Sequence, residues 1–378
     1  MNQYPLIAFI ADVHVGNHKF LGGDVSSRMN NRFRETNNIL KYACQLAKSD
    51  GCDAMVVCGD LFDTDHPEPP QVAAVQEALT EGPDTYIILG NHEMCSMSPR
   101  DHALASMDGY TNPKTGSTIR VIDKTELVHI GGYEKDQSIL MVPFRPGDAK
   151  TWFEAEVMSV KNIPENSLVA FHLGVSDNTT AANEPWMMGS HDQIHVKTLG
   201  NVMDRFGLSA AFAGNWHQHM FWELDRDKVV YQIGALVPTG WNNPGGDEHY
   251  GSLVYYDSSD GSILRNVVKG PRYHKFSSFQ KWLPHSSDEM MRARIEVSAA
   301  ELEEVRAQVE AEMPMGYVEV VVGAKHTKQA AKAAAAKVKN AAYSQGDLRQ
   351  YIHDQNLGVD FGQVEEEVRM YLQEAKKK

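Results

Sequence analysis

The segment Ala54-Met-Val-Val-Cys58 is a short apolar run that leads directly into Gly59-Asp60-Leu-Phe-Asp63. Five consecutive apolar residues are typical of a strand that is buried on both faces of a sheet. Ligand sites in open α/β sheets lie beyond the carboxyl ends of the strands, and Asp60 stands at such a position. The segment therefore predicts a buried strand of an α/β fold with a functional carboxylate at its end.

Four more short apolar runs in the first two-thirds of the chain end in polar residues that are capable of chemistry. They are Leu6–Ile10 before Asp12-Val-His14, Tyr86–Leu89 before Gly90-Asn91-His92-Glu93, Leu168–Phe171 before His172, and Ala210–Ala213 before Gly214-Asn215-Trp216-His217-Gln218-His219. Two segments with helical spacing of apolar residues, Phe33–Lys48 and Pro69–Leu79, separate the first three runs. This alternation of strand and helix predicts a layered α/β core.

Later apolar runs lack such helices between them, at Ser138–Val142, Val229–Ile233 and Leu253–Tyr256. They predict additional strands, in a second sheet packed on the first.

The C-terminal part of the chain has a different pattern. Ala293–Val297 reads as a strand, Ser298–Glu301 has the spacing of a capping box that opens a helix, and Gly316–Val322 reads as another strand. We therefore expect one domain over residues 1–272 and a smaller α+β domain over residues 273–378. Helical periodicity after Gln345 predicts helices that bind a partner protein.

Composition narrows the class of protein. Fifty acidic residues against thirty-six basic residues give a net charge of −14, which argues against indiscriminate coating of nucleic acid. The sequence has no stretch of the ~18 apolar residues that a membrane span needs, and its start has no secretory pattern. Four cysteines without a CxxC pair fit a reducing compartment. We expect a cytoplasmic protein that does not bind membranes.

The polar residues after the five runs are carboxylates, an amide and imidazoles, without a thiolate. Such donors suit manganese, iron or zinc, and two ions can share one bridging carboxylate. Two ions ~3.5–4 Å apart can hold a phosphate, activate a water and stabilise the leaving oxygen.

Taken in order, the five motifs resemble those of the calcineurin-like metallophosphoesterases. The first reads Asp-x-His-x-Gly over 12–16 and the second Gly-Asp-Leu-Phe-Asp over 59–63, and both look like the SbcD branch, the nuclease subunit of a DNA-repair complex. The resemblance covers roughly residues 5–240. It implies a two-sheet α/β/β/α sandwich followed by a smaller α+β capping domain.

The resemblance also implies a set of metal ligands. Asp12, His14 and Asp60 would hold the first ion, and Asp60 would bridge to a second ion held also by Asn91 and His172.

Two further residues are assigned to catalysis by the resemblance. His92 would lie beside the scissile phosphate, where it would protonate the leaving oxygen or stabilise developing charge. Glu93 stands where the family usually has Asp, and we expect its carboxylate to orient His92.

The last motif departs from the family pattern Gly-His-x-His. One alignment makes Asn215 and His217 the ligands, so that an amide replaces an imidazole. The other inserts two residues and uses His217 and His219, which keeps both donors of the preferred type. We favour His217 and His219. Two residues close to the first two motifs have ordinary explanations. His18 is expected to be a loop residue without a ligand role, and Asp63 could instead cap a helix.

The expected function is that of a DNA exonuclease and endonuclease dependent on two divalent ions, most simply Mn2+. The expected partners are DNA, an SbcC-type ATPase and a second copy of the chain in a homodimer. An alternative is another phosphatase or small-molecule phosphodiesterase of the superfamily. A third interpretation is a scaffold with a degenerate site that binds the ATPase without doing chemistry.

Overall fold

The computed structural model divides the chain into two compact units, Met1–Arg272 and Tyr273–Lys378. The residues that it describes are 3–18, 28–96, 98, 100–131, 136–177, 192–224, 228–238, 240, 251–287, 291–312 and 317–323. The helices predicted after Gln345 lie outside these residues.

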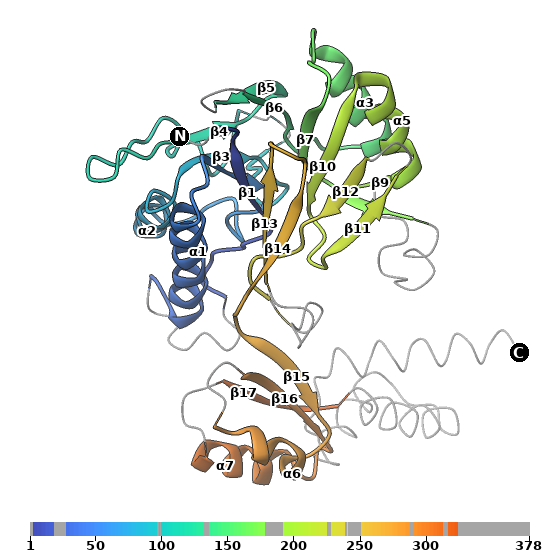
Figure 1. Ribbon diagram of the computed structural model, residues 1–378. Coiled ribbons are helices and arrows are strands. Elements are labelled where there is room, and N and C mark those ends of the chain that lie inside the picture. The colour runs from blue at the N-terminus through green and yellow to red at the C-terminus, as the bar shows by residue number, and fades with distance from the viewer. Residues whose placement is uncertain are drawn as a thin grey trace, which may run out of the picture. The chain divides into compact units, whose positions relative to one another are not determined.

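The first unit contains two six-stranded sheets (Figure 1). The first sheet has the order β14-β13-β1-β2-β3-β4. Its strands are β1 (Leu6–Ile10), β2 (Ala54–Cys58), β3 (Asp84–Ile88), β4 (Ile119–Ile122), β13 (Gly251–Asp257) and β14 (Ile263–Val268). Strands β1 to β4 run parallel, and β13 and β14 extend the sheet in antiparallel fashion.

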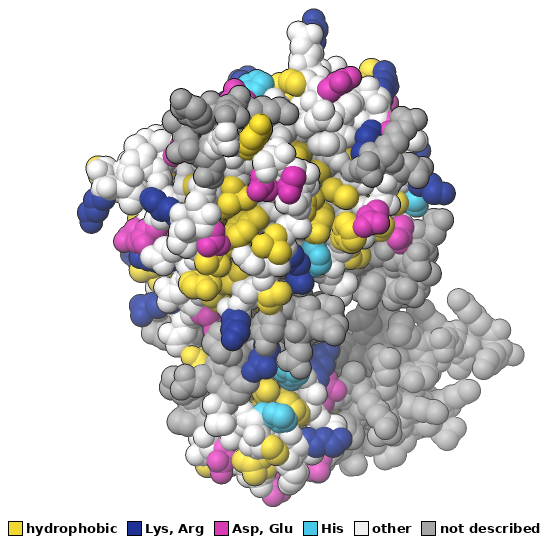
Figure 2. All heavy atoms as spheres, in the orientation of Figure 1, with side chains coloured by type: hydrophobic (Ala, Val, Ile, Leu, Met, Phe, Trp, Pro, Cys, Tyr) yellow, Lys and Arg dark blue, Asp and Glu magenta, His cyan; other side chains and the backbone are white. Residues whose placement is uncertain are grey.

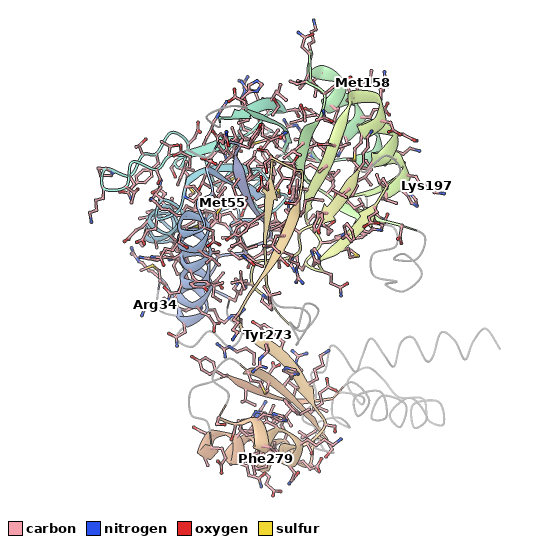
Figure 3. The ribbon with its side chains drawn as sticks, in the orientation of Figure 1. Arg34, Met55, Met158, Lys197, Tyr273 and Phe279 are labelled. Carbon is pink, nitrogen blue, oxygen red and sulfur yellow. The ribbon has the colours of Figure 1, made fainter. Side chains whose placement is uncertain are left out.

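Two helices, α1 (Asn31–Ser49) and α2 (Pro69–Leu79), cover the outer face of the first sheet (Figure 1). Asn30 caps α1, because its side chain accepts a hydrogen bond from the backbone amide of Phe33. Met55 of β2 lies on the α1 side of the sheet, where its sulfur is 3.8 Å from that of Cys44 (Figure 3).

The second sheet has the order β11-β12-β10-β7-β6-β5. Its strands are β5 (Glu126–Ile130), β6 (Gln137–Val142), β7 (Ser167–His172), β10 (Leu208–Gly214), β11 (Met220–Glu223) and β12 (Val229–Gln232). Two short strands that follow β7 in the sequence, β8 (Gly174–Ser176) and β9 (Gln193–His195), form a separate two-stranded parallel sheet.

Helices α3 (Ala149–Ser159) and α5 (Val196–Phe206) pack on the outer face of the second sheet. The second sheet expected from the sequence is present, but the expectation that its strands lack helices between them is wrong: α3 lies between β6 and β7, and α5 lies between β9 and β10. Their signal was present, since Ala149, Phe153 and Val157 recur at helical spacing and are buried.

The inner faces of the two sheets meet in a continuous apolar core. Phe9 of β1 stacks on Phe212 of β10 at 3.9 Å between ring centroids, with the rings nearly parallel. This packing holds the two sheets together. The predicted α/β/β/α sandwich is confirmed.

The second unit has a three-stranded sheet of β15 (Arg272–Phe276), β16 (Met291–Val297) and β17 (Val318–Val322). Strands β16 and β17 are parallel and are joined through α7 (Leu302–Glu312). The short helices α6 (Phe279–Trp282) and η2 (Leu283–His285) precede β16. This unit has its own hydrophobic core, in which Trp282 is buried against residues of α7 and the sheet. The described part of this unit is the expected small α+β fold.

The rim of the first unit carries exposed apolar side chains. Leu264 and Val267 of β14 are 60% and 51% exposed, and Figure 2 shows hydrophobic side chains gathered on the face that carries this strand. A pocket of about 330 Å³ between β12 and the β13–β14 turn is lined by Phe221, Tyr231 and Tyr256. None of the metal-ligand candidates lines it, so it is separate from the predicted phosphoester site.

Within the described residues, no helix combines the length and apolar character needed to cross a membrane.

Candidate metal centre

The motif residues gather where the parallel strands of both sheets end. The first sheet supplies Asp12 and His14 after β1, Asp60 after β2, and Asn91 after β3, and the second supplies His172 at the end of β7 and His217 after β10. All these residues except Asn91 belong to groups of donor atoms that lie within 4.8 Å of one another, and Asn91 contacts one of them. The centre therefore spans the two sheets.

The loops that carry these donors have an unusual backbone. Asp12, His14, Asp60 and Asn215 have positive φ angles of 50°, 49°, 52° and 79°. L-residues enter this left-handed region at a cost, and such residues concentrate at functional sites. The backbone amides of Asp12 and His14 donate to the carbonyls of Gly59 and Asp60, which holds the turns in place.

Two glycines leave room for the donors. A Cβ on Gly59 would lie 2.2 Å from Nδ1 of His172, and a Cβ on Gly90 would lie 2.1 Å from Oδ1 of Asp60. Atoms that are not bonded to each other do not approach this closely, so a side chain at either position would displace its neighbour. The glycines of the second and third motifs therefore allow the backbone to approach the ligand side chains closely.

The first subsite is formed by Asp12, His14, Asp60 and His217. The Nε2 atoms of His14 and His217 lie 3.0 Å apart, and Nε2 of His14 lies 3.6 Å from Oδ2 of Asp60. Oδ2 of Asp12 is buried and has no hydrogen-bond partner. Burial and then the positive charge of His14 lower the pKa of His217 to about 3, so its imidazole is neutral and can donate a lone pair. A buried, unpartnered carboxylate oxygen beside imidazole and carboxylate donors fits a divalent cation.

The second subsite is formed by Asp60, Asn91 and His172. Nε2 of His172 lies 2.9 Å from Oδ1 of Asn91 and 3.3 Å from Oδ2 of Asp60. Its Nδ1 donates to the carbonyl of Cys58 at 2.7 Å, which turns Nε2 toward the donors. Burial opposes the charge on His172, but Asp60 outweighs it and raises its pKa to about 10. A cation at this point would take the place of that proton.

Asp60 lies between the two subsites, as a bridging ligand must. Burial disfavours its ionised form, but His172 and then His14 and His92 outweigh burial and hold the pKa of Asp60 well below its usual range. The ionised form of Asp60 is therefore favoured, and its carboxylate lies within reach of both groups of donors.

His92 is placed at the edge of the centre. Its backbone amide donates to Oδ1 of Asp60 at 3.0 Å, and its Nδ1 donates to the carbonyl of Asp63 at 3.2 Å. Its Nε2 lies 4.0 Å from Oδ2 of Asp60, and its side chain is 39% exposed. The ring is therefore held on its inner side and remains accessible to a substrate.

The expected role of Glu93 is corrected by the structure. Glu93 is fully buried, and its carboxylate accepts hydrogen bonds from the backbone amides of Gly90, Asp60 and Phe62 at 2.8, 3.1 and 2.9 Å. Both of its oxygens are used in this way, and it is the carbonyl of Asp63 that orients His92. Glu93 fastens the loop after β3 to the loop after β2.

The favoured alignment of the last motif is also corrected. His219 belongs to none of the donor groups found among the described residues. Its ring packs 5.5 Å from that of Tyr231, and its Nδ1 lies 3.3 Å from the carbonyl of Ile233. Asn215 is the residue at the centre, since its backbone amide donates to Oδ1 of Asp12 at 2.9 Å and its Nδ2 donates to the carbonyl of Asp192 at 3.0 Å. The structure therefore places His217, and not His219, among the donor atoms, with Asn215 contacting Asp12 through its backbone amide.

Two residues near the centre were not assigned a function from the sequence. Asp63 lies with Oδ1 3.4 Å from Nδ1 of His14 and with Oδ2 3.3 Å from Nδ1 of His18. Nε2 of His18 also lies 3.0 Å from the carbonyl of His14. Asp63 therefore holds the ring of His14, and His18 contacts both Asp63 and the backbone of His14. The signal available for Asp63 was its fixed place three residues after Asp60 in the second motif.

One family model matches the chain over the residues that carry the site. The family model described as calcineurin-like phosphoesterase matches residues 5–221. No curated protein sequence matches the chain. Three solved structures are similar to it: TT1561 of Thermus thermophilus, a dimetal phosphatase from Danio rerio, and a novel archaeal phosphodiesterase.

These similarities are distant. The sequence identities are 12%, 12% and 9%, and the TM-scores are 0.44, 0.43 and 0.34, in the same order. The matches cover 70%, 71% and 69% of this chain and 100%, 100% and 99% of the other. The family model alone spans more than half of the chain, over the residues that carry all the candidate metal ligands. The chain belongs to the calcineurin-like phosphoesterase family, whose members are metal-dependent hydrolases of phosphoesters.

Proposed function

We propose that this chain is a nuclease of the SbcD type, which hydrolyses phosphodiester bonds of DNA with two divalent cations. The observation that carries the proposal is the convergence of donors from five strands on Asp60, with the half-exposed His92 beside it. The motifs at 12–16 and 59–63 favour DNA as the substrate, because they look like those of the SbcD branch.

Two divalent cations in this centre would neutralise charge on the phosphate and promote ionisation of the attacking water. Asp12, His14, Asp60 and His217 would hold one of them, and Asp60, Asn91 and His172 would hold the other, with the backbone of Asn215 keeping Asp12 in place. In the reaction, a bond forms between the phosphorus and the water oxygen, and the bond to the leaving sugar oxygen breaks.

His92 is the protein's own acid in this scheme. Because Nδ1 donates to the carbonyl of Asp63, Nε2 is the nitrogen that faces the substrate. A proton on Nε2 would pass to the leaving oxygen, or would hydrogen-bond to a phosphate oxygen as negative charge develops. Its exposure lets it reach a polymer that lies across the centre.

The donor set favours manganese. The second subsite offers a carboxylate, an amide oxygen and one imidazole, and Asn215 stands where the family has another imidazole. Oxygen-rich donors suit Mn2+ better than zinc, which prefers nitrogen and sulfur.

The charge of the chain supports a partner. A net charge of −14 opposes long-range attraction to DNA, so an autonomous nuclease would bind its substrate weakly. We therefore include an SbcC-type ATPase that contributes the surface for holding DNA, a homodimeric assembly, and a capping role of the second unit as parts of the proposal.

The experiment that tests the proposal compares four substrates with Mn2+: linear double-stranded DNA, single-stranded DNA, an aryl phosphodiester and an aryl phosphomonoester. His92→Ala is the inactive control, and His219→Ala is a matched histidine variant outside the centre. Cleavage of DNA that requires Mn2+ and His92 would support the proposal.

Other outcomes favour the other candidates. Turnover of the small diester or the monoester alone, also after addition of an ATPase partner, would assign the chain to small substrates. Fewer than one bound ion per protomer across manganese and zinc would indicate a scaffold with a degenerate site.

A further inference from the structure

A second group of metal-ligating side chains lies outside the centre described above. Asp65 and His66 are in the loop that follows β2, and Cys95 is in the loop that follows β3. One donor atom from each lies within 4.8 Å of the others. We propose that Asp65, His66 and Cys95 form a separate binding site for a zinc-like divalent cation.

The chemistry of the three donors is that of zinc. Thiolate, imidazole and carboxylate are the three kinds of side chain that ligate Zn2+ in proteins, and three protein ligands leave a fourth position for water. The phosphoesterase centre has no thiolate among its ligands, so the two sites differ in the metal that they prefer. None of the three residues belongs to the five motifs.

Contacts within the loops hold the donors together. Nδ1 of His66 lies 2.7 Å from Oδ1 of Asp65, and the backbone amide of His66 donates to Oγ1 of Thr64. Sγ of Cys95 lies 3.2 Å from the carbonyl of Asp65, and its backbone amide donates to the carbonyl of Asp101. The arrangement therefore exists before a cation binds, which reduces the cost of ordering the site.

Accessibility singles out Cys95 among the four cysteines, all of which lie in the described part of the chain. Cys44, Cys52 and Cys58 are buried, whereas Cys95 is half-buried. The side chain of His66 is 75% exposed, so a cation can reach the site from solvent. On binding, the thiol of Cys95 loses its proton to solvent and the sulfur forms the bond to the cation.

The position of the site gives it a consequence for the enzyme. Asp65 lies two residues after Asp63, whose carbonyl orients His92. Cys95 lies two residues after Glu93, whose carboxylate joins the loop after β3 to the loop after β2. A cation bound here would cross-link the loop after β2 to the loop after β3. The inference does not depend on which phosphoester the enzyme cleaves.

The test uses Co2+ as a spectroscopic probe on the full chain. Cobalt bound by a thiolate has a near-ultraviolet charge-transfer band, which cobalt in the oxygen and nitrogen ligands of the phosphoesterase centre lacks. We expect this band in the wild-type protein and in His217→Ala, and its loss in Cys95→Ser. Absence of the band from the wild type, or its persistence in Cys95→Ser, would overturn the proposal.

A second measurement reads the thiol directly. Mass spectrometry after brief alkylation should show Zn2+ protecting Cys95 in the wild type and in His219→Ala, and little protection in His66→Ala. Equal alkylation of Cys95 with and without Zn2+ in the wild type would also refute the site.

Discussion

The Nε2 atoms of His14 and His217 face each other at 3.0 Å, although the residues are 203 positions apart in the sequence and follow strands of different sheets. Burial opposes a charge on His14, but Asp63 and then Asp60 outweigh it and raise its pKa, whereas the pKa of His217 is lowered to about 3. Without a cation, Nε2–H of His14 therefore donates a hydrogen bond to Nε2 of His217. A divalent cation would replace this proton and bind both nitrogens.

This relationship distinguishes the two alignments of the last motif experimentally. His217→Ala should lose at least one bound Mn2+ after dialysis, because it removes a ligand, while His219→Ala should keep the wild-type content. Elemental analysis of the purified variants measures both. Equal metal loss in the two variants would contradict the position that the structure gives to His219.

His92→Ala should lower the turnover number roughly 10²- to 10⁴-fold, the usual contribution of a general acid. Metal content and the melting temperature should stay nearly unchanged, because the side chain of His92 is exposed and is not a predicted ligand. Steady-state kinetics with the preferred phosphodiester and elemental analysis provide the two readouts. Wild-type turnover would exclude an acid role for this histidine.

Glu93→Gln should destabilise the protein by about 1–3 kcal/mol, since an amide N–H would face a backbone N–H where the carboxylate now accepts. Urea unfolding of the metal-free protein measures the loss. An unchanged free energy of unfolding together with a shifted pH–rate profile would instead indicate that Glu93 acts through His92.

Asn215→His should strengthen binding of the second cation. Histidine tolerates the left-handed backbone found at this position, and its ring would add the imidazole that the family pattern has. Calorimetric titration with Mn2+ and Zn2+ should show tighter binding of the second ion, with the larger gain for Zn2+. If neither affinity rises, the side chain at 215 does not face the second subsite.

The stability of the protein should depend on His219 at acidic pH. Burial and then Arg265 lower the pKa of His219 to about 4, below the unfolded value of about 6.5. The folded state therefore binds fewer protons than the unfolded state in this window, and stability falls as the pH falls from about 6.5 to 4.

The contribution of His219 amounts to about 1–2 kcal/mol after allowance for its partial exposure to solvent. His219→Gln should remove this part of the acid sensitivity. Urea unfolding at pH 7 and pH 4.5 measures it, and an unchanged difference between the two pH values in the variant would contradict the assignment.

Much of the sandwich is predictable from the sequence because strands buried on both faces leave an unmistakable apolar run. The polar residue that ends each run, such as Asp60 or His172, marks the carboxyl end of a strand, where the site must lie. The helix α3 carries a weak apolar pattern, but α5 does not: Val196, Leu199, Val202 and Met203 are buried and recur at helical spacing, so its sequence did contain the signal.

The misassigned residues depend on neighbours that are remote in the sequence. Glu93 follows His92 directly, yet its carboxylate points to amides of the preceding loops, including that of Phe62, 31 positions away. His219 is chemically the better ligand, but it immediately precedes β11 and is drawn against Tyr231 by the pairing of β11 with β12. Donor type alone could not reveal either placement.

The stacking of Phe9 on Phe212 has a consequence for metal choice. Three of the five ligand-bearing strands belong to one sheet and two to the other, so the separation between the sheets sets how far His172 and His217 stand from Asp60. Cation size must match that separation. If ions bind across the two sheets, their selectivity depends partly on this apolar interior, and we expect an exchange such as Phe212→Leu to alter which ion binds although it changes no ligand.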